Sequence, residues 1–177
     1  FSAETRVNFK GEYYTLDDAP FAPQPVQKKL PVLIGGGGEK RTLALVAKYA
    51  DNYNFFGNFI GSAEVYNHKS AVLDEHCARI GRDPKEIKRS LCLFADIEHD
   101  AAKAKGRREF LGSNLEQANR DGLLFGTPQQ IVEGTRAVLE KVKVDEVIFC
   151  GLTNTVENFQ EFNDEVLKPL SKVTVGA

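Results

Sequence analysis

The sequence contains no methionine and no tryptophan, and only three of its 177 residues are cysteines. Cys77, Cys92 and Cys150 are far apart and match no metal-ligand spacing. We therefore expect reduced thiols in a cytoplasmic protein, with no metal site and no disulfide framework. Without a methionine the chain has no initiator residue, and it opens on Phe1. This opening suggests a fragment, a processed chain or an incomplete reading frame.

A strong excess of charge is also missing, since 23 lysines and arginines face 25 aspartates and glutamates, for a net charge of −2. This balance gives no electrostatic reason to expect binding to nucleic acid or to an anionic membrane. No apolar run approaches the roughly 20 residues that a membrane-spanning helix needs, and no signal peptide is recognisable. The hydrophobic content of 42% is that of a globular protein, and the length fits one domain.

Two regions differ along the chain. Residues 1–29 contain Pro20, Pro23 and Pro25, which predict an extended lead-in without a helix. From residue 30 to residue 177, short apolar runs alternate with amphipathic segments. The runs predict four strands, near residues 30–34, 51–57, 90–97 and 145–151. The segments between and after them predict helices near residues 39–50, 62–80, 100–119, 127–142 and 155–170, with Thr127 and Gln130 forming a capping box.

The alternation of strands and helices is typical of parallel βαβ units, so we expect an α/β fold. Two arrangements agree with it: an open, doubly wound sheet, or part of a (β/α)8 barrel. A complete barrel typically needs about 250 residues and eight units. Four units would make half of one.

Four consecutive glycines follow the first of these strands and precede a helix, in "PVLIGGGGEKR". At the carboxyl end of a parallel strand, such a turn can bring backbone N–H groups close to an anion, and the helix dipole favours negative charge there. The spacing matches neither a P-loop nor a Rossmann turn. A permissive turn packed tightly against the sheet is the alternative. The candidate phosphate-binding residues are Gly35, Gly36, Gly37, Gly38, Lys40 and Arg41.

The stretch from Phe9 to Gly57, with its "GEYY", "PQPVQ", "LIGGGGEKR" and "YADNYN" elements, resembles the luciferase-like oxidoreductase superfamily and most of all its deazaflavin-dependent branch. The later segments "GRDPKEIKRS" and "GTPQQIVEGTRAVLEKVKVDEVIF" are also similar to that family. The resemblance implies a parallel (βα)4 unit, the C-terminal half of a luciferase-like (β/α)8 barrel, with strands five to eight of the family. It places the cofactor phosphate at the glycine turn.

The resemblance further implies hydride transfer between a coenzyme F420-type deazaflavin, or FMN as second choice, and an unknown small organic substrate. It suggests Asn54, Gly57 and Asn58 for substrate or cofactor binding, although asparagines are also ordinary turn residues. It identifies no catalytic acid or base, and we expect His68 and His76 to be surface residues. Half a barrel exposes strand edges, so we expect a homodimer or pairing with a complementing half. The alternative function is a truncated, non-catalytic module that binds phosphate or cofactor without turnover.

Overall fold

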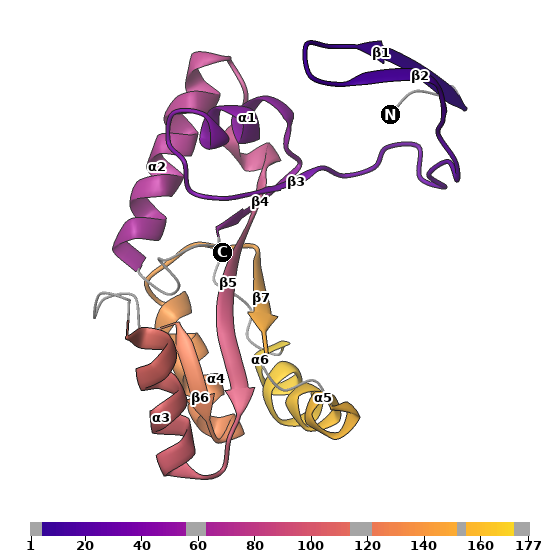
Figure 1. The fold of residues 1–177 in the computed structure, drawn as a ribbon. Coiled ribbons are helices and arrows are strands. Elements are labelled where there is room, and N and C mark those ends of the chain that lie inside the picture. The colour runs from indigo at the N-terminus through magenta and orange to yellow at the C-terminus, as the bar shows by residue number, and fades with distance from the viewer. Residues whose placement is uncertain (1–4, 56–62, 114–121, 152–154, 172–177) are drawn as a thin grey trace. The chain divides into compact units, whose positions relative to one another are not determined.

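The computed structural model describes residues 5–55, 63–113, 122–151 and 155–171, and the chain divides into two compact units, Phe1–Val32 and Leu33–Ala177. The first unit contains an antiparallel hairpin of β1 (Arg6–Lys10) and β2 (Thr15–Pro20) (Figure 1). The amide of Gly11 donates to the carbonyl of Tyr14 at 2.8 Å and closes the connection between the two strands. The sequence did not indicate this pairing.

The second unit contains a sheet of five parallel strands, in the order β3 (Leu33–Gly35), β4 (Asn52–Phe55), β5 (Lys88–Ile97) and β6 (Leu123–Gly126), with β7 (Glu146–Cys150) also paired to β5. The long β5 joins the others. Its first four residues pair with β4, its last four with β6, and its middle with β7. Because β7 overlaps both pairings, β4 and β6 share one edge of β5 and β7 occupies the other (Figure 1).

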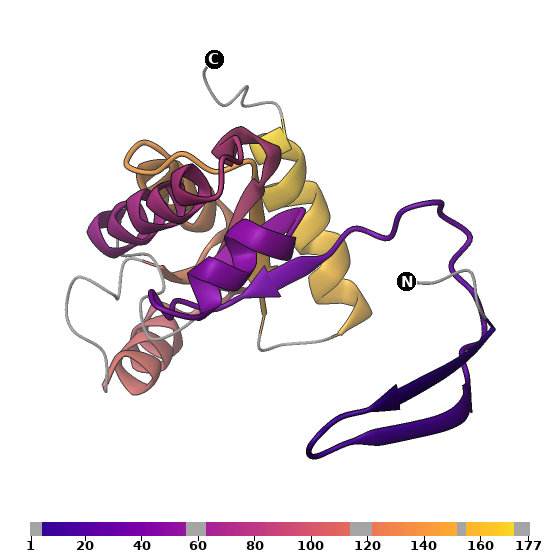
Figure 2. The same cartoon turned by 90° about the horizontal axis from the view of Figure 1, so that it is seen from above.

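Helices connect these strands. They are α1 (Thr42–Tyr49), α2 (Ala63–Arg79), the short 3-10 helix Pro84–Glu86, α3 (Ala101–Gly112) and α4 (Pro128–Leu139). After β7 come α5 (Val156–Phe162), a π-helical turn (Asn163–Leu167) and α6 (Lys168–Ser171). Figure 2 shows the last three as one continuous rod in yellow. Each parallel connection thus contains a helix, as βαβ units require.

The core follows from the pleat of the strands, because alternate residues point to opposite faces of a sheet. One face carries Tyr53, Phe55, Leu91 and Leu93, which are buried in one cluster with residues of α1, α2 and α4. Phe55 packs edge-on against Tyr66 with ring centroids 5.8 Å apart. On the other face, α3 packs on β6 in a smaller cluster of Ala104, Leu123 and Phe125.

The predicted parallel α/β architecture is confirmed, and all four predicted strands are present. A fifth strand, β6, was not predicted, although all four of its residues are buried. The capping box at the start of α4 is also present. Parts of two predicted helices, Ser62 and residues 114–119, lie outside the described residues.

Candidate functional site

The glycine turn joins the carboxyl end of β3 to the start of α1. Gly36 has φ of +125°, a conformation that side chains strongly disfavour. Its amide donates to the carbonyl of Asn54 at 3.2 Å, and its carbonyl accepts from the hydroxyl of Tyr53 at 3.0 Å. Both partners lie on β4, so the neighbouring strand holds Gly36 in this conformation.

Gly37 and Gly38 bring bare backbone close to the surrounding side chains. A Cβ atom on Gly38 would lie 2.8 Å from Thr42 Oγ1, and one on Gly37 would lie 3.5 Å from the ring of Phe55. The turn is therefore packed tightly against the start of α1 and the end of β4. This packing agrees with the alternative expected from the sequence, a turn packed tightly against the sheet.

The amide groups of the turn supply hydrogen-bond donors. Within the described parts of the chain, no backbone N–H from Gly37 to Arg41 donates a hydrogen bond. Arg41 occupies the N-cap position of α1, and its side chain makes no capping hydrogen bond. The amide of Leu43, the second residue of α1, donates to the carbonyl of Gly38 at 3.0 Å. The start of α1 therefore combines available donors with the positive end of a helix dipole.

Glu39 ties the turn to α2. Its carboxylate accepts from Lys69 Nζ at 2.5 Å and lies 3.0 Å from His68 Nε2, while its backbone carbonyl accepts from His76 Nε2 at 2.7 Å. The hydrogen bond from Lys69, followed by that from His68, lowers the pKa of the Glu39 carboxyl. Both histidines expected at the surface thus contact Glu39, a role that the sequence did not indicate.

Lys40 and Arg41, the two predicted cations, are exposed. Neither forms an ion pair within the residues that the structure describes. They follow the glycines after Glu39, between the turn and the first residue of α1. Their charges are available to an anion, but solvent screens them.

Asn54 lies beside the turn, although its side chain points elsewhere. Its backbone pairs with Gly35, whereas its Nδ2 atom donates to Ser90 Oγ at 2.8 Å on the sheet face opposite Tyr53 and Phe55. Ser90 is buried and donates in turn to the carbonyl of Tyr53 at 3.2 Å. Gly57 and Asn58, the other two predicted binding residues, lie outside the described residues.

Cys92 and Cys150 are adjacent on β5 and β7, with sulfur atoms 3.2 Å apart and no disulfide between them. Burial, and then the hydrogen bond with Cys150, raises the pKa of the Cys92 thiol to about 12. No group of three or more potential metal ligands occurs among the described residues. No described helix is both long and apolar enough to span a membrane.

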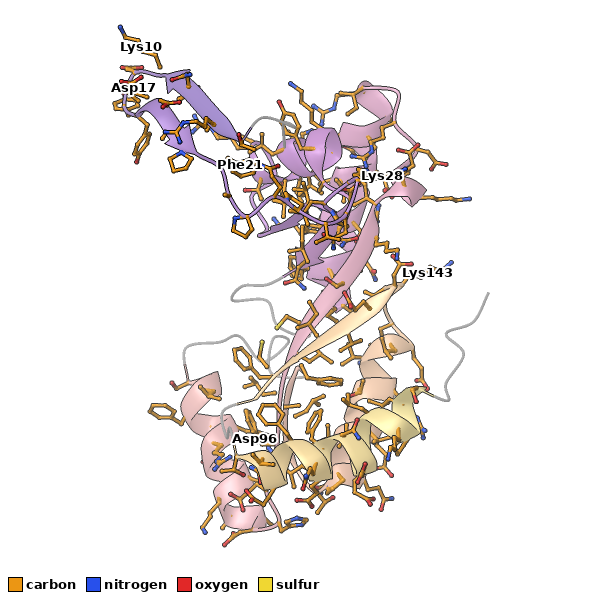
Figure 3. All side chains as sticks on the ribbon, turned by 90° about the vertical axis from the view of Figure 1, so that its right-hand side faces the viewer. Lys10, Asp17, Phe21, Lys28, Asp96 and Lys143 are labelled. Carbon is orange, nitrogen blue, oxygen red and sulfur yellow. The ribbon has the colours of Figure 1, made fainter. Side chains whose placement is uncertain are left out.

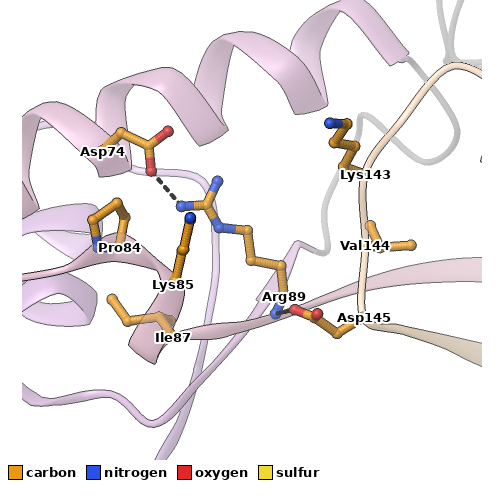
Figure 4. Close-up of a pocket in the computed structure, with 8 residues that line it drawn as sticks. All are labelled: Asp74, Pro84, Lys85, Ile87, Arg89, Lys143, Val144 and Asp145. Atoms are coloured by element: carbon orange, nitrogen blue, oxygen red, sulfur yellow. Dashed lines mark hydrogen bonds and ion pairs between the residues drawn. The ribbon is translucent and has the colours of Figure 1, made fainter. Parts of the chain in front are cut away.

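An open cavity of about 630 Å³ lies at the amino ends of β5 and β7 (Figure 4). Arg89 forms an ion pair with Asp74 there, and its backbone amide donates to the carboxylate of Asp145 at 2.7 Å. Figure 3 places Lys143, which lines this cavity, at the opposite end of the sheet from Asp96 on β5. In parallel α/β folds ligands bind at the carboxyl ends of strands, so the glycine turn is the better candidate.

Comparison with known proteins adds sequence relatives. The model of one family, the luciferase-like monooxygenases, matches residues 2–122. Pyrimidine monooxygenase RutA of Enterobacter cloacae is 32% identical over 127 residues, which are 66% of this chain and 33% of that protein. RutA of Caulobacter vibrioides is 32% identical over 117 residues, 64% of this chain and 31% of its own. The chain therefore spans about a third of the length of these relatives.

Solved structures of similar fold are enzymes with barrels of this class. An F420-dependent secondary alcohol dehydrogenase, in complex with an F420–acetone adduct, matches 94% of this chain and 55% of its own at a TM-score of 0.65 and 17% identity. Riboflavin lyase with modified FMN matches 97% of this chain and 49% of its own, at a TM-score of 0.66 and 12% identity. The F420-dependent tetrahydromethanopterin reductase of Methanopyrus kandleri matches 92% of this chain and 58% of its own, at a TM-score of 0.59 and 14% identity. These likenesses show the fold: a parallel α/β unit that covers part of a (β/α)8 barrel.

Proposed function

Because the chain belongs to the luciferase-like monooxygenase family, we propose that its glycine turn binds the phosphate group of a redox cofactor. The enzyme would transfer hydride between a deazaflavin coenzyme of the F420 type, or FMN as second choice, and a small organic substrate. The observation that carries the proposal is the row of amides from Gly37 to Arg41, which donate no hydrogen bond within the described residues. Such donors at a helix start are suited to an anion.

The residues of the turn fit a phosphate group in three respects. Gly36 adopts a backbone conformation open to glycine, Gly38 has no room for a Cβ atom, and the helix behind them has no side-chain cap. In this proposal the backbone of Gly35, Gly36, Gly37 and Gly38 forms the phosphate-binding turn. The amides of Gly37 and Gly38 are the donors, and Lys40 and Arg41 add positive charge. Asn54, Gly57 and Asn58 are proposed for the substrate or for the ring end of the cofactor. The flavin or deazaflavin itself supplies the redox chemistry, and the protein supplies binding and orientation.

Both cofactors occur among structures of similar fold, one with an F420 adduct and one with modified FMN. Both carry a phosphate group on the side chain of the ring system, so a phosphate-binding turn serves either. The pyrimidine monooxygenases named above offer a heterocyclic substrate as one example of a small molecule. For this chain we propose a substrate from the class of small organic molecules.

A complementing partner is part of the proposal. Within the described residues, β3 pairs only with β4, and β7 pairs only with β5. Unpaired strand edges favour association with another chain. We therefore propose a homodimer or a complex with a complementing half-barrel, and sedimentation of a stable monomer at micromolar concentration would contradict it.

A non-catalytic binding module is the second candidate. Besides the cations Lys40 and Arg41, the ionisable side chains at the turn are Glu39 and its two partners, and the Glu39 carboxylate contacts both Lys69 and His68. In this candidate these contacts support the turn and take no part in acid–base chemistry. A chain that binds cofactor and shows no turnover would support this candidate.

Titration of the purified chain with FMN, riboflavin and oxidised coenzyme F420 tests the proposal. We expect binding of FMN or F420, monitored by fluorescence of the ring system. Riboflavin is the matched control, because it has the ring and ribityl chain of FMN without the phosphate. Equal affinity for FMN and riboflavin would rule out a phosphate site, and binding of neither FMN nor F420 would contradict the cofactor proposal for this chain.

A further inference from the structure

Lys69 stands on the buried side of α2. It follows the buried Tyr66 by three residues and precedes the buried Leu73 by four, so it lies on the stripe that faces the core. Its side chain is only 15% exposed. A lysine in such a place is rarely buried without a partner.

The partner comes from the glycine turn. Lys69 Nζ lies 2.5 Å from Glu39 Oε1, and its Cε atom lies 3.9 Å from the position of a Cβ atom on Gly37. The ammonium group therefore lies next to the turn whose amides, within the described residues, donate no hydrogen bond. The carboxylate of Glu39 is the anion that this cation now binds.

We infer that Lys69 is the principal cation for the cofactor phosphate and that Glu39 is an internal competitor, which the phosphate displaces from Lys69. This inference rests on the proposed function, since it concerns the same turn. On binding, the ammonium group exchanges a carboxylate oxygen for a phosphate oxygen. No covalent bond forms or breaks.

Burial distinguishes Lys69 from the two cations that the sequence indicated. Lys40 and Arg41 are exposed, so water and salt weaken their attraction for an anion. Lys69 is mostly shielded from solvent, where a charge-assisted hydrogen bond is stronger. Its ion pair with Glu39 also holds the side chain in place before the ligand binds.

A purely structural ion pair makes a different prediction from a competitor. If Glu39 only braced the turn, its loss would loosen the turn and weaken phosphate binding. If Glu39 competes for Lys69, its neutralisation frees the ammonium group and removes a negative charge from the site, so binding becomes tighter. Glu39→Gln and Lys69→Met should therefore change phosphate affinity in opposite directions.

The test measures the dissociation constants of FMN and inorganic phosphate for the 177-residue chain and its variants. We expect Lys69→Met to weaken FMN binding about tenfold or more, the range of a charge-assisted hydrogen bond. Lys69→Arg should retain most of the affinity, which shows that the charge matters. Glu39→Gln should bind both probes about threefold or more tightly, even where its melting temperature falls. Lys40→Met is the matched control and should change the affinity less than Lys69→Met does.

The outcomes separate this inference from the proposed function. Phosphate-dependent binding by the wild type that Lys69→Met leaves unchanged would overturn the inference and keep the function. Weaker binding by Glu39→Gln would show a structural brace and overturn the competitor. Equal FMN and riboflavin affinities in the wild type would overturn both. Melting curves of every variant show that the compared chains are folded.

Discussion

Two helices of the second unit, α1 and α4, begin after short parallel strands, and they differ in the hydrogen bonding of their first backbone amides. At the start of α4, Thr127 accepts from the amide of Gln130, and the side chain of Gln130 accepts from the amide of Thr127 at 3.0 Å. At the start of α1, Arg41 caps nothing, and the amides from Gly37 to Arg41 donate no hydrogen bond within the described residues. The start of α4 is capped by its own side chains, whereas the start of α1 has no side-chain cap.

The difference supports the proposal that the start of α1 serves binding, whereas the start of α4 serves stability. A capping box typically contributes about 0.5–2 kcal/mol to helix stability. The start of α1 gives up that stabilisation, and it carries two exposed cations that the helix dipole disfavours. A bound anion would reverse both penalties, which supports the proposed phosphate site.

Among the substitutions that test the contrast between the starts of α1 and α4, Gly36→Ala should lower the free energy of unfolding most. A side chain at φ of +125° is strained, and we expect a loss of about 1–3 kcal/mol in the free energy of unfolding. FMN binding should weaken as well, because the turn shifts. Gly81→Ala is the matched control: its φ is +71° and its Cβ atom would meet no atom within 4 Å. Chemical denaturation should show a lower free energy of unfolding for both variants. Unchanged FMN affinity in Gly36→Ala would show that the turn does not take part in FMN binding.

Thr127→Ala should cost about 1 kcal/mol in the free energy of unfolding, because it removes the side-chain cap of α4. Thr127→Ser keeps the hydroxyl and should remain close to the wild type. Neither variant should change the affinity for FMN. A measurable change of affinity in Thr127→Ala alone would mean that the two helix starts are coupled and that the contrast between them is too simple.

Arg41→Asp should raise the stability of the folded chain and lower its affinity for FMN. An acidic side chain interacts favourably with the helix N-terminus, so we expect about 0.3–1 kcal/mol of added stability at low salt. The same charge repels a phosphate group, so FMN should bind several-fold more weakly. Lys48→Asp, at the other end of α1, is the control and should lower stability, because the dipole there favours cations. Weaker binding without a gain in stability would show that α1 has no unmet electrostatic preference.

Much of the architecture was predictable because each strand and helix has a strong local pattern. The run from Leu91 to Ile97 is almost continuously apolar, which predicts a buried strand. Thr127, Pro128 and Gln130 form a pattern typical of a helix N-terminus. The strand β6 was missed because "LLFG" is only four residues long and directly precedes that helix signal. Its pairing with the far half of β5 depends on contacts that no local pattern shows.

The candidate site was predictable only in part. Four consecutive glycines indicated the turn in the sequence. The contacts that α2 makes with Glu39 were not indicated. Lys69 offered one usable signal, since a lysine between Tyr66 and Leu73 interrupts an apolar stripe. The pairing of Glu39 with residues about thirty positions later is a tertiary contact, and nothing in the local sequence indicates it.

The pH dependence of stability should show the smallest difference between the two helix starts. Lys69 and then His68 lower the pKa of Glu39 below its ordinary value of 4.5, so the carboxylate stabilises the folded chain above that pH. This contribution is lost as the pH falls through the lowered pKa, because protonation then removes the ion pair. Since Glu39 is 41% exposed, solvent screening keeps the effect small.

The experiment compares wild type with Glu39→Gln by chemical denaturation from pH 6 to pH 2.5. The wild type should be the more stable above about pH 5, and the difference should vanish toward the acid end. Other carboxyls with lowered pKa, such as Asp100 and Asp164, are present in both chains and cancel in the comparison. The side chains that cap α4, Thr127 and Gln130, do not titrate, so Thr127→Ala should give a loss that is the same at every pH. A constant difference for Glu39→Gln would mean that its ion pair adds nothing to the folded state.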